Sequence, residues 1–150
     1  MLAPITCALM LGCAAPLPPP PPPSGLPVPE QRAFFTTSPD SVFPALRQAC
    51  AAPTQRVVQT GPDAIECRML LPPDATAGAI LRYGGMVTQL PELVIRLRLT
   101  PIDAGYELAA AQYLEVPRAT GGDLRVVYPD PQLERRLRAV LASFGGEVSP

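Results

Sequence analysis

Six consecutive prolines at residues 18–23 restrict the fold of this chain more than any other feature. Proline fixes φ and lacks a backbone N–H group, so such a run does not suit a helix interior or a paired strand. From Pro16 to Pro29 the chain contains nine prolines, and we predict an extended polyproline II rod of about 3.1 Å per residue. The rod separates a short amino-terminal segment from roughly 120 residues, the length of one ordinary domain.

The segment before the prolines is apolar and ends at a cysteine. Residues 1–12 carry no charge and are too few to cross a bilayer, because a spanning helix needs about 20 apolar residues. The residues Leu11-Gly12-Cys13 resemble the lipobox of bacterial lipoprotein signal peptides, in which a small residue precedes the acylated cysteine. This resemblance implies that residues 1–12 are a signal peptide, that Cys13 carries the lipid, and that Ala14 allows sorting to the outer membrane.

The lipobox resemblance also implies where the protein works. Several acyl chains on Cys13, palmitate among them, would anchor it firmly, since each buried CH2 contributes about 0.8 kcal/mol. Residues 13–30 then form the lipidated cysteine and a Pro-rich tether, which holds the domain roughly 40 Å from the membrane, in the periplasm. Two alternatives stay open: an ordinary secretory signal in which Cys7 and Cys13 are incidental, and a proline run that binds a partner's proline-binding groove.

Charge and composition exclude several function classes. All 12 basic residues are Arg and they balance 13 acidic residues, so no strong field exists to attract nucleic acid. Histidine, the commonest general base and metal ligand near neutral pH, is absent. The aspartates lie in expected turns or at helix starts, where aspartate has structural roles. We therefore expect a protein that is not an enzyme, with no catalytic residue, metal site or cofactor.

The hydrophobic pattern predicts helices and strands in alternation. We expect helices at 42–51, 75–83 and 131–144, and strands at 56–59, 64–71, 93–100, 106–116 and 124–128. The last helix has the clearest pattern, an apolar stripe about 100° wide. The stripe contains Leu133, Leu137, Val140, Leu141 and Phe144, and leaves Arg135, Arg136 and Arg138 outside it.

These elements predict a single α+β domain over residues 31–148. We expect an antiparallel sheet of four to five strands with helices packed on one face, in two layers. The order of the segments 42–50, 56–71, 93–116 and 132–144 resembles the helix-grip domains of the lipoprotein BamC, a subunit of the machinery that assembles outer-membrane barrels. The resemblance is one of architecture, and implies a helix-grip-like fold.

Two cysteines remain in the domain. Cys50 lies on the apolar face of the helix at 42–51 and Cys67 on the apolar face of the strand at 64–71, so we expect them to form a disulfide outside the cytoplasm. Two separately buried thiols are the alternative. No CxxC spacing occurs, so a redox-active pair is not expected. On the strands, Glu66 with Arg68, or Glu107 with Arg96, are the candidates for cross-strand pairs.

Together these features predict an outer-membrane-anchored periplasmic lipoprotein that acts as an accessory or scaffold subunit of an envelope complex. Its partners would be the membrane, through the lipid, and other envelope proteins. The alternative is a carrier for a lipid or other hydrophobic ligand, for which Ala109, Ala110 and Ala111 would leave room. A component of a pilus, secretion or phage assembly is a third. A carrier needs a cavity of several hundred Å³, whereas a scaffold needs an exposed apolar patch or an open strand edge.

Overall fold

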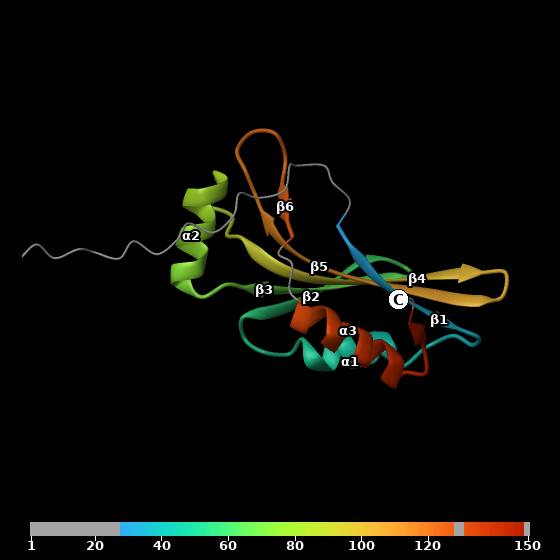
Figure 1. The fold of residues 1–150 in the computed structure, drawn as a ribbon. Coiled ribbons are helices and arrows are strands. Elements are labelled where there is room, and N and C mark those ends of the chain that lie inside the picture. Colours follow the sequence, from blue (N-terminus) through green and yellow to red (C-terminus); the bar gives the residue numbers. More distant parts are fainter. Residues whose placement is uncertain (1–27, 128–130, 149–150) are drawn as a thin grey trace, which may run out of the picture.

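The computed structural model describes residues 28–127 and 131–148, so the expected signal peptide, Cys13 and most of the tether lie outside the described residues. Within the described residues, three helices and seven strands follow one another (Figure 1). In chain order they are β1 (Glu30–Phe35), α1 (Val42–Ala49), β2 (Gln55–Gly61), β3 (Ala64–Leu70), α2 (Pro73–Tyr83), β4 (Glu92–Ile102), β5 (Gly105–Val116), β6 (Leu124–Val126), α3 (Pro131–Ser143) and β7 (Glu147–Val148). The predicted α+β class is confirmed.

All of these strands pair antiparallel in one sheet, with β5 near its centre. The order is β2-β3-β4-β5-β1-β7, and β6 also pairs with β5. β4 lies along β5 from residue 105 to residue 115. The opposite edge of β5 is shared, because β1 pairs with residues 106–111 and β6 with residues 114–116. β1 therefore lies between β5 and β7, two strands that come much later in the chain.

The sheet is larger than the four to five strands that the sequence predicts. β1 and β7 are the unpredicted strands, and they pair with each other. The sequence of β1, Glu30–Phe35, ends in two adjacent phenylalanines, so polar and apolar residues do not alternate clearly along it. In the structure only the second phenylalanine, Phe35, is buried. β7 has only two residues, too few for any periodicity. Both segments form strands because distant segments pair with them. The hydrophobic pattern within a short stretch of sequence does not predict such pairing.

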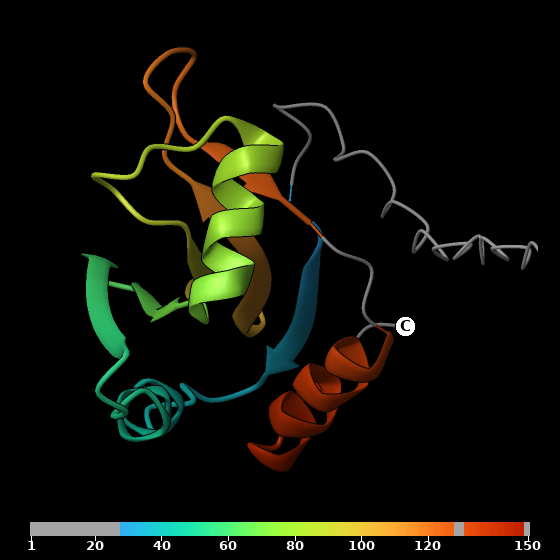
Figure 2. The same cartoon turned by 90° about the vertical axis from the view of Figure 1, so that its left-hand side faces the viewer.

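Two apolar clusters make the core. The first joins α1 and α3 to the sheet and consists of Ala33, Phe35, Val42, Ile65, Leu97, Leu108, Ala110 and Leu141. The second joins α2 to the end of β5 and to β6, and consists of Ala79, Tyr83, Leu114, Val116, Leu124 and Val126. Figure 1 shows α1 and α3 on the same side of the sheet, and Figure 2 shows α2 standing apart from them.

The predicted disulfide is present. Cys50 follows α1 and Cys67 lies in β3, with their Cα atoms 5.8 Å apart and both residues buried. The bond holds the end of α1 on the sheet. Because the residues are 17 apart in the sequence, closing this loop stabilises the fold by about 3 kcal/mol in the chain-entropy model.

The helices differ from the predictions in detail. α2 begins at Pro73, two residues before the predicted start at residue 75, with Pro72 as its N-cap and Asp74 in its first turn. A proline at the first helical position lacks only an N–H group that would be unpaired there in any case. In α3, Leu141 is buried as predicted, but Val140 is 51% exposed. Arg138 is partly buried, in contrast to the fully solvated position that its place outside the stripe predicts.

Candidate docking surface

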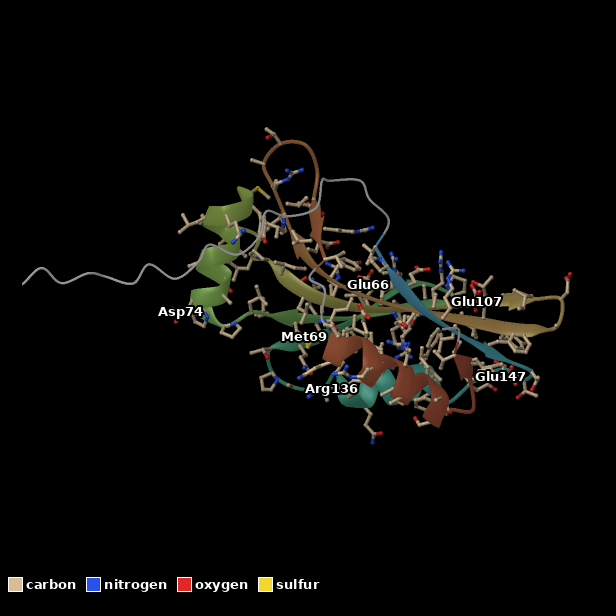
Figure 3. All side chains as sticks on the ribbon, viewed as in Figure 1. Glu66, Met69, Asp74, Glu107, Arg136 and Glu147 are labelled. Atoms are coloured by element: carbon tan, nitrogen blue, oxygen red, sulfur yellow. A yellow bond between two sulfur atoms is a disulfide. The ribbon has the colours of Figure 1, made fainter. Side chains whose placement is uncertain are left out.

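The two faces of the sheet have opposite characters. Side chains alternate along a strand, so Leu108 and Ala110 of β5 enter the core while Glu107 and Ala109 point the other way. Figure 3 shows Glu66 and Glu107 on the side of the sheet away from α1 and α3. We call this side the charged face. Its charged residues are Glu30, Arg32, Arg56, Glu66, Arg68, Glu92, Arg96, Arg98, Glu107, Glu115 and Arg125.

One end of the charged face is centred on Glu30, the first residue of β1. Its Oε2 lies 3.1 Å from Nη2 of Arg32 and 3.3 Å from Nη2 of Arg98. Its Oε1 accepts a longer hydrogen bond, 3.4 Å, from Nη2 of Arg96. We call these four residues the Glu30 cluster. Arg32 also donates to Glu107 at 3.0 Å, so the group holds three guanidinium groups against two carboxylates.

Two small residues of β5 make the Glu30 cluster possible. Ala109 lies between Arg32 on β1 and Arg98 on β4, and Ala111 lies between Glu30 and Arg96. β1 and β4 are separated by the width of β5, and strands lie about 4.8 Å apart. Because the two alanines carry only a methyl group, the long side chains on either side meet above them.

The other end of the charged face is centred on Arg68 of β3. Its Nη2 lies 2.7 Å from Oε2 of Glu66, and its Nη1 lies 2.7 Å from Oε1 of Glu115 and 3.3 Å from Oε2 of Glu92. We call these four residues the Arg68 cluster. Arg56 reinforces it through two hydrogen bonds to Glu92, of 3.0 and 2.6 Å.

Arg68 separates two carboxylates that would otherwise repel each other. Glu92 of β4 lies directly opposite Glu115 of β5, and like charges in that position destabilise a sheet. Arg68 reaches both across Val94, which is completely buried. Burial by itself would lower the pKa of Arg68, but its hydrogen bonds to Glu115 and Glu66 outweigh that effect and raise the pKa. The guanidinium therefore stays charged under all ordinary conditions.

Tyr113 of β5 connects the two clusters. Its hydroxyl group donates to Oε1 of Glu66 at 3.3 Å, and the ring lies beneath the guanidinium groups of Arg96 and Arg125, 5.7 and 5.1 Å from the ring centroid. Cations above an aromatic face are attracted to it. Burial, and then the negative charge of Glu66, raise the pKa of Tyr113. The charged face is thus one continuous network.

Two of the hollows lined by described residues bear on the carrier alternative. The larger, with a cavity volume of about 320 Å³, opens beside the Arg68 cluster and is lined by Arg56, Glu92, Glu115 and Asp123 among others. The smaller, of about 220 Å³, lies near the start of α1, between Asp40, Phe43 and Leu99. Neither is the large apolar cavity that a lipid carrier needs. Ala109, Ala110 and Ala111 are all buried, and none of them lines either hollow.

The sheet also has an edge at β2, which among the described residues pairs only with β3. The pairing of β2 with β3 changes register between Gln59 and Gly61, and Arg56 adds a charged side chain to β2. Bulges and charges are devices by which natural proteins protect strand edges from pairing with other chains. The charged face is therefore the better candidate for a docking surface.

The predicted site residues have different outcomes. Cys13 lies outside the described residues, and Cys50 and Cys67 form a buried structural bond. Glu66 and Arg68 form an ion pair, but both lie in β3, so the pair does not join two strands as predicted. The Arg96–Glu107 pair was a wrong prediction, because the register places Arg96 opposite Ala111 and Glu107 opposite Thr100. The charged face was missed for the same reason, although alternating Arg and Glu residues on the predicted strands carried part of its pattern.

The described residues contain no group of three or more His, Cys, Asp and Glu side chains placed to hold a metal ion. None of the helices in residues 28–127 and 131–148 has the length and apolar character that a bilayer crossing requires. Comparisons with protein-family models, curated proteins and solved structures find no match to this chain.

Proposed function

We propose that this chain is an outer-membrane-anchored periplasmic lipoprotein, and that its domain is an accessory or scaffold subunit that docks an envelope protein on the charged face. The observation that carries the proposal is the ordered network of the Glu30 and Arg68 clusters, which crosses the sheet from β2 to β6. A surface that only needs to be solvated does not require buried carboxylates such as Glu66 and Glu115. A preorganised polar surface does favour specific docking.

The proposal includes a two-layer, helix-grip-like arrangement in which all three helices cover one face. Leu114 and Val116, which pack with α2, follow Leu108 and Ala110 at two-residue intervals along β5. Side chains at such intervals lie on the same face of a strand. α2 then belongs to the same layer as α1 and α3, and the charged face is left for a partner.

The docking part is tested by photo-crosslinking from two exposed positions of the full chain in its native cells. One crosslinking residue replaces Thr100, which is exposed and lies opposite Glu107 on the charged face. The other replaces Arg136 on α3 (Figure 3). We expect one defined protein adduct from position 100 and none of that size from position 136. Equal adducts from both positions, or none from position 100, would contradict docking on this face.

The anchor is tested separately by metabolic labelling with palmitate. The wild-type chain should incorporate the label, and Cys13→Ala should lose it, because a thioether at this cysteine is the expected attachment point. Cys50→Ala and Cys67→Ala together provide the matched control and should retain the label. Equal labelling of wild type and Cys13→Ala would remove the basis for the anchor and the compartment.

A further inference from the structure

We propose that the charged face recognises an acidic polypeptide segment through arginine side chains that project above buried carboxylates. This inference rests on the proposed docking function and specifies the chemistry of the partner. It is argued from the exposure of the charged groups, from their arrangement on the strands, and from the hydrogen-bond donors that the network leaves unused.

The two signs of charge are not equally exposed on this face. The side chains of four arginines are about half exposed: Arg56 57%, Arg98 51%, Arg125 50% and Arg32 49%. The carboxylates with which they pair are all less exposed: Glu107 34%, Glu92 14%, Glu30 13% and Glu115 10%. A partner that approaches the sheet therefore meets guanidinium groups first, although the whole chain is close to neutral.

Several guanidinium donors on the face have no partner among the described residues. Arg98 makes its hydrogen bonds to Glu30 through Nη2 alone, so its Nε and Nη1 donate to nothing among the described residues. Arg125 contacts Glu115 through Nε at 3.5 Å, and its two Nη groups are likewise unused there. A guanidinium group has five donors in a planar fork that matches a carboxylate. These donors can bind carboxylates of another chain while the internal network stays intact.

The arrangement suits an extended chain better than a single small anion. The four half-exposed arginines lie on β1, β2, β4 and β6, so they are spread across the sheet instead of converging on one point. Polynucleotides are a poorer match, because a net charge of −1 provides no long-range attraction for a dense polyphosphate. An acidic polypeptide segment satisfies these conditions.

Fluorescence anisotropy of the full chain in neutral detergent tests the inference. The probe is a labelled peptide of five Glu-Ser repeats, and a peptide of five Lys-Ser repeats is its counterpart. We expect the acidic probe to bind, the basic probe not to bind, and binding to weaken with salt. Arg32→Gln with Arg98→Gln should weaken binding about tenfold, since two exposed charged contacts are lost.

The matched control removes the same charge elsewhere. Arg135→Gln with Arg136→Gln on α3 takes two exposed guanidinium groups from the other side of the molecule and should leave binding unchanged. Circular dichroism of both double variants checks that they are folded. Equal weakening by the two double variants would overturn the inference, because net charge alone would then explain binding.

Tighter binding of a thymidine oligonucleotide or of phosphatidylglycerol vesicles than of the acidic peptide would also overturn the inference. A Thr100 adduct without acidic-peptide binding would leave docking in place and reject only the acidic partner.

Discussion

At the scale of single residues, the methyl groups of Ala109 and Ala111 decide the chemistry of the charged face. Both residues are buried, and each is flanked on both neighbouring strands by a long charged side chain of the Glu30 cluster. A larger residue at either position would occupy the space in which Glu30 meets the arginines of β4. The run of three alanines in β5 is therefore explained by packing on both faces, since Ala110 belongs to the first apolar cluster.

Arg68 should be the most sensitive charged residue of the network. Arg68→Met leaves the buried Glu66 without its cation and Glu92 facing Glu115, so we expect a loss of about 3 kcal/mol in unfolding free energy. Arg56→Gln, at an exposed end of the same network, should lose less than about 1 kcal/mol. Urea denaturation measures both. The double variant Arg68→Met with Glu66→Met should recover part of the loss. Equal losses for Arg68→Met and Arg56→Gln would show that burial does not govern these ion pairs.

Tyr113 should make stability fall at alkaline pH. Its pKa is raised in the folded protein, so its contribution is complete below the ordinary tyrosine pKa of about 10 and is lost as the pH rises above it. The unfolded chain releases its proton there while the folded one retains it. The chain contains no lysine, so no ammonium side chain titrates in this pH range.

The measurement compares wild type with Tyr113→Phe. The variant lacks the hydrogen bond to Glu66 and should be less stable by about 1 kcal/mol at neutral pH. Between roughly pH 9 and pH 11 the difference should shrink, because only wild type loses this contribution. Urea denaturation across that range provides the unfolding free energies. Parallel curves would mean that Tyr113 titrates alike in the folded and unfolded chains.

At the scale of elements, the β4–β5 hairpin depends on a glycine that the sequence marks only as part of a turn. Gly105 has φ +145°, and a Cβ atom there would overlap the carbonyl oxygen of Phe35 on the neighbouring β1. The hairpin thus passes close to the end of β1, and a side chain at position 105 would disturb the packing of β1 against the β4–β5 hairpin. A pattern of turn residues predicts the turn, but not the approach of β1.

Two glycine substitutions should therefore change the stability of the protein in opposite directions. Gly105→Ala should destabilise the protein by at least about 1 kcal/mol, because it adds strain and a clash. Gly78→Ala, in the exposed interior of α2 with no atom within 4 Å of the added Cβ, should stabilise it by about 0.5–1 kcal/mol. Thermal unfolding followed by circular dichroism measures both. A change of the same sign in the two variants would contradict this account.

At the scale of the whole molecule, β5 joins two apolar clusters that lie at different ends of the sheet. Leu108 and Ala110 belong to the first cluster, and Leu114 and Val116 to the second. The same strand also carries Glu107, Tyr113 and Glu115 of the charged face. Because one strand passes through every part of the domain, we expect all parts to unfold together.

Core truncations in each cluster test this cooperativity. Leu108→Ala in the first cluster and Leu124→Ala in the second should each lower the unfolding free energy by about 2–5 kcal/mol. Far-ultraviolet circular dichroism and tyrosine fluorescence should report a single coincident urea transition in both variants. A separate early transition in Leu124→Ala would instead show that α2 and β6 form an independent unit.

The sequence by itself determined the α+β class, the positions of the helices and hairpins, and the Cys50–Cys67 disulfide, because each of these follows from periodicity, turn residues or the face that a residue occupies. Only the tertiary structure decided that β1 and β7 join the sheet and that the charged face exists. Arg98 and Glu30, for example, are 68 residues apart. Their contact depends on the pairing of β5 with strands on both sides, and a local window of sequence contains no information on that register.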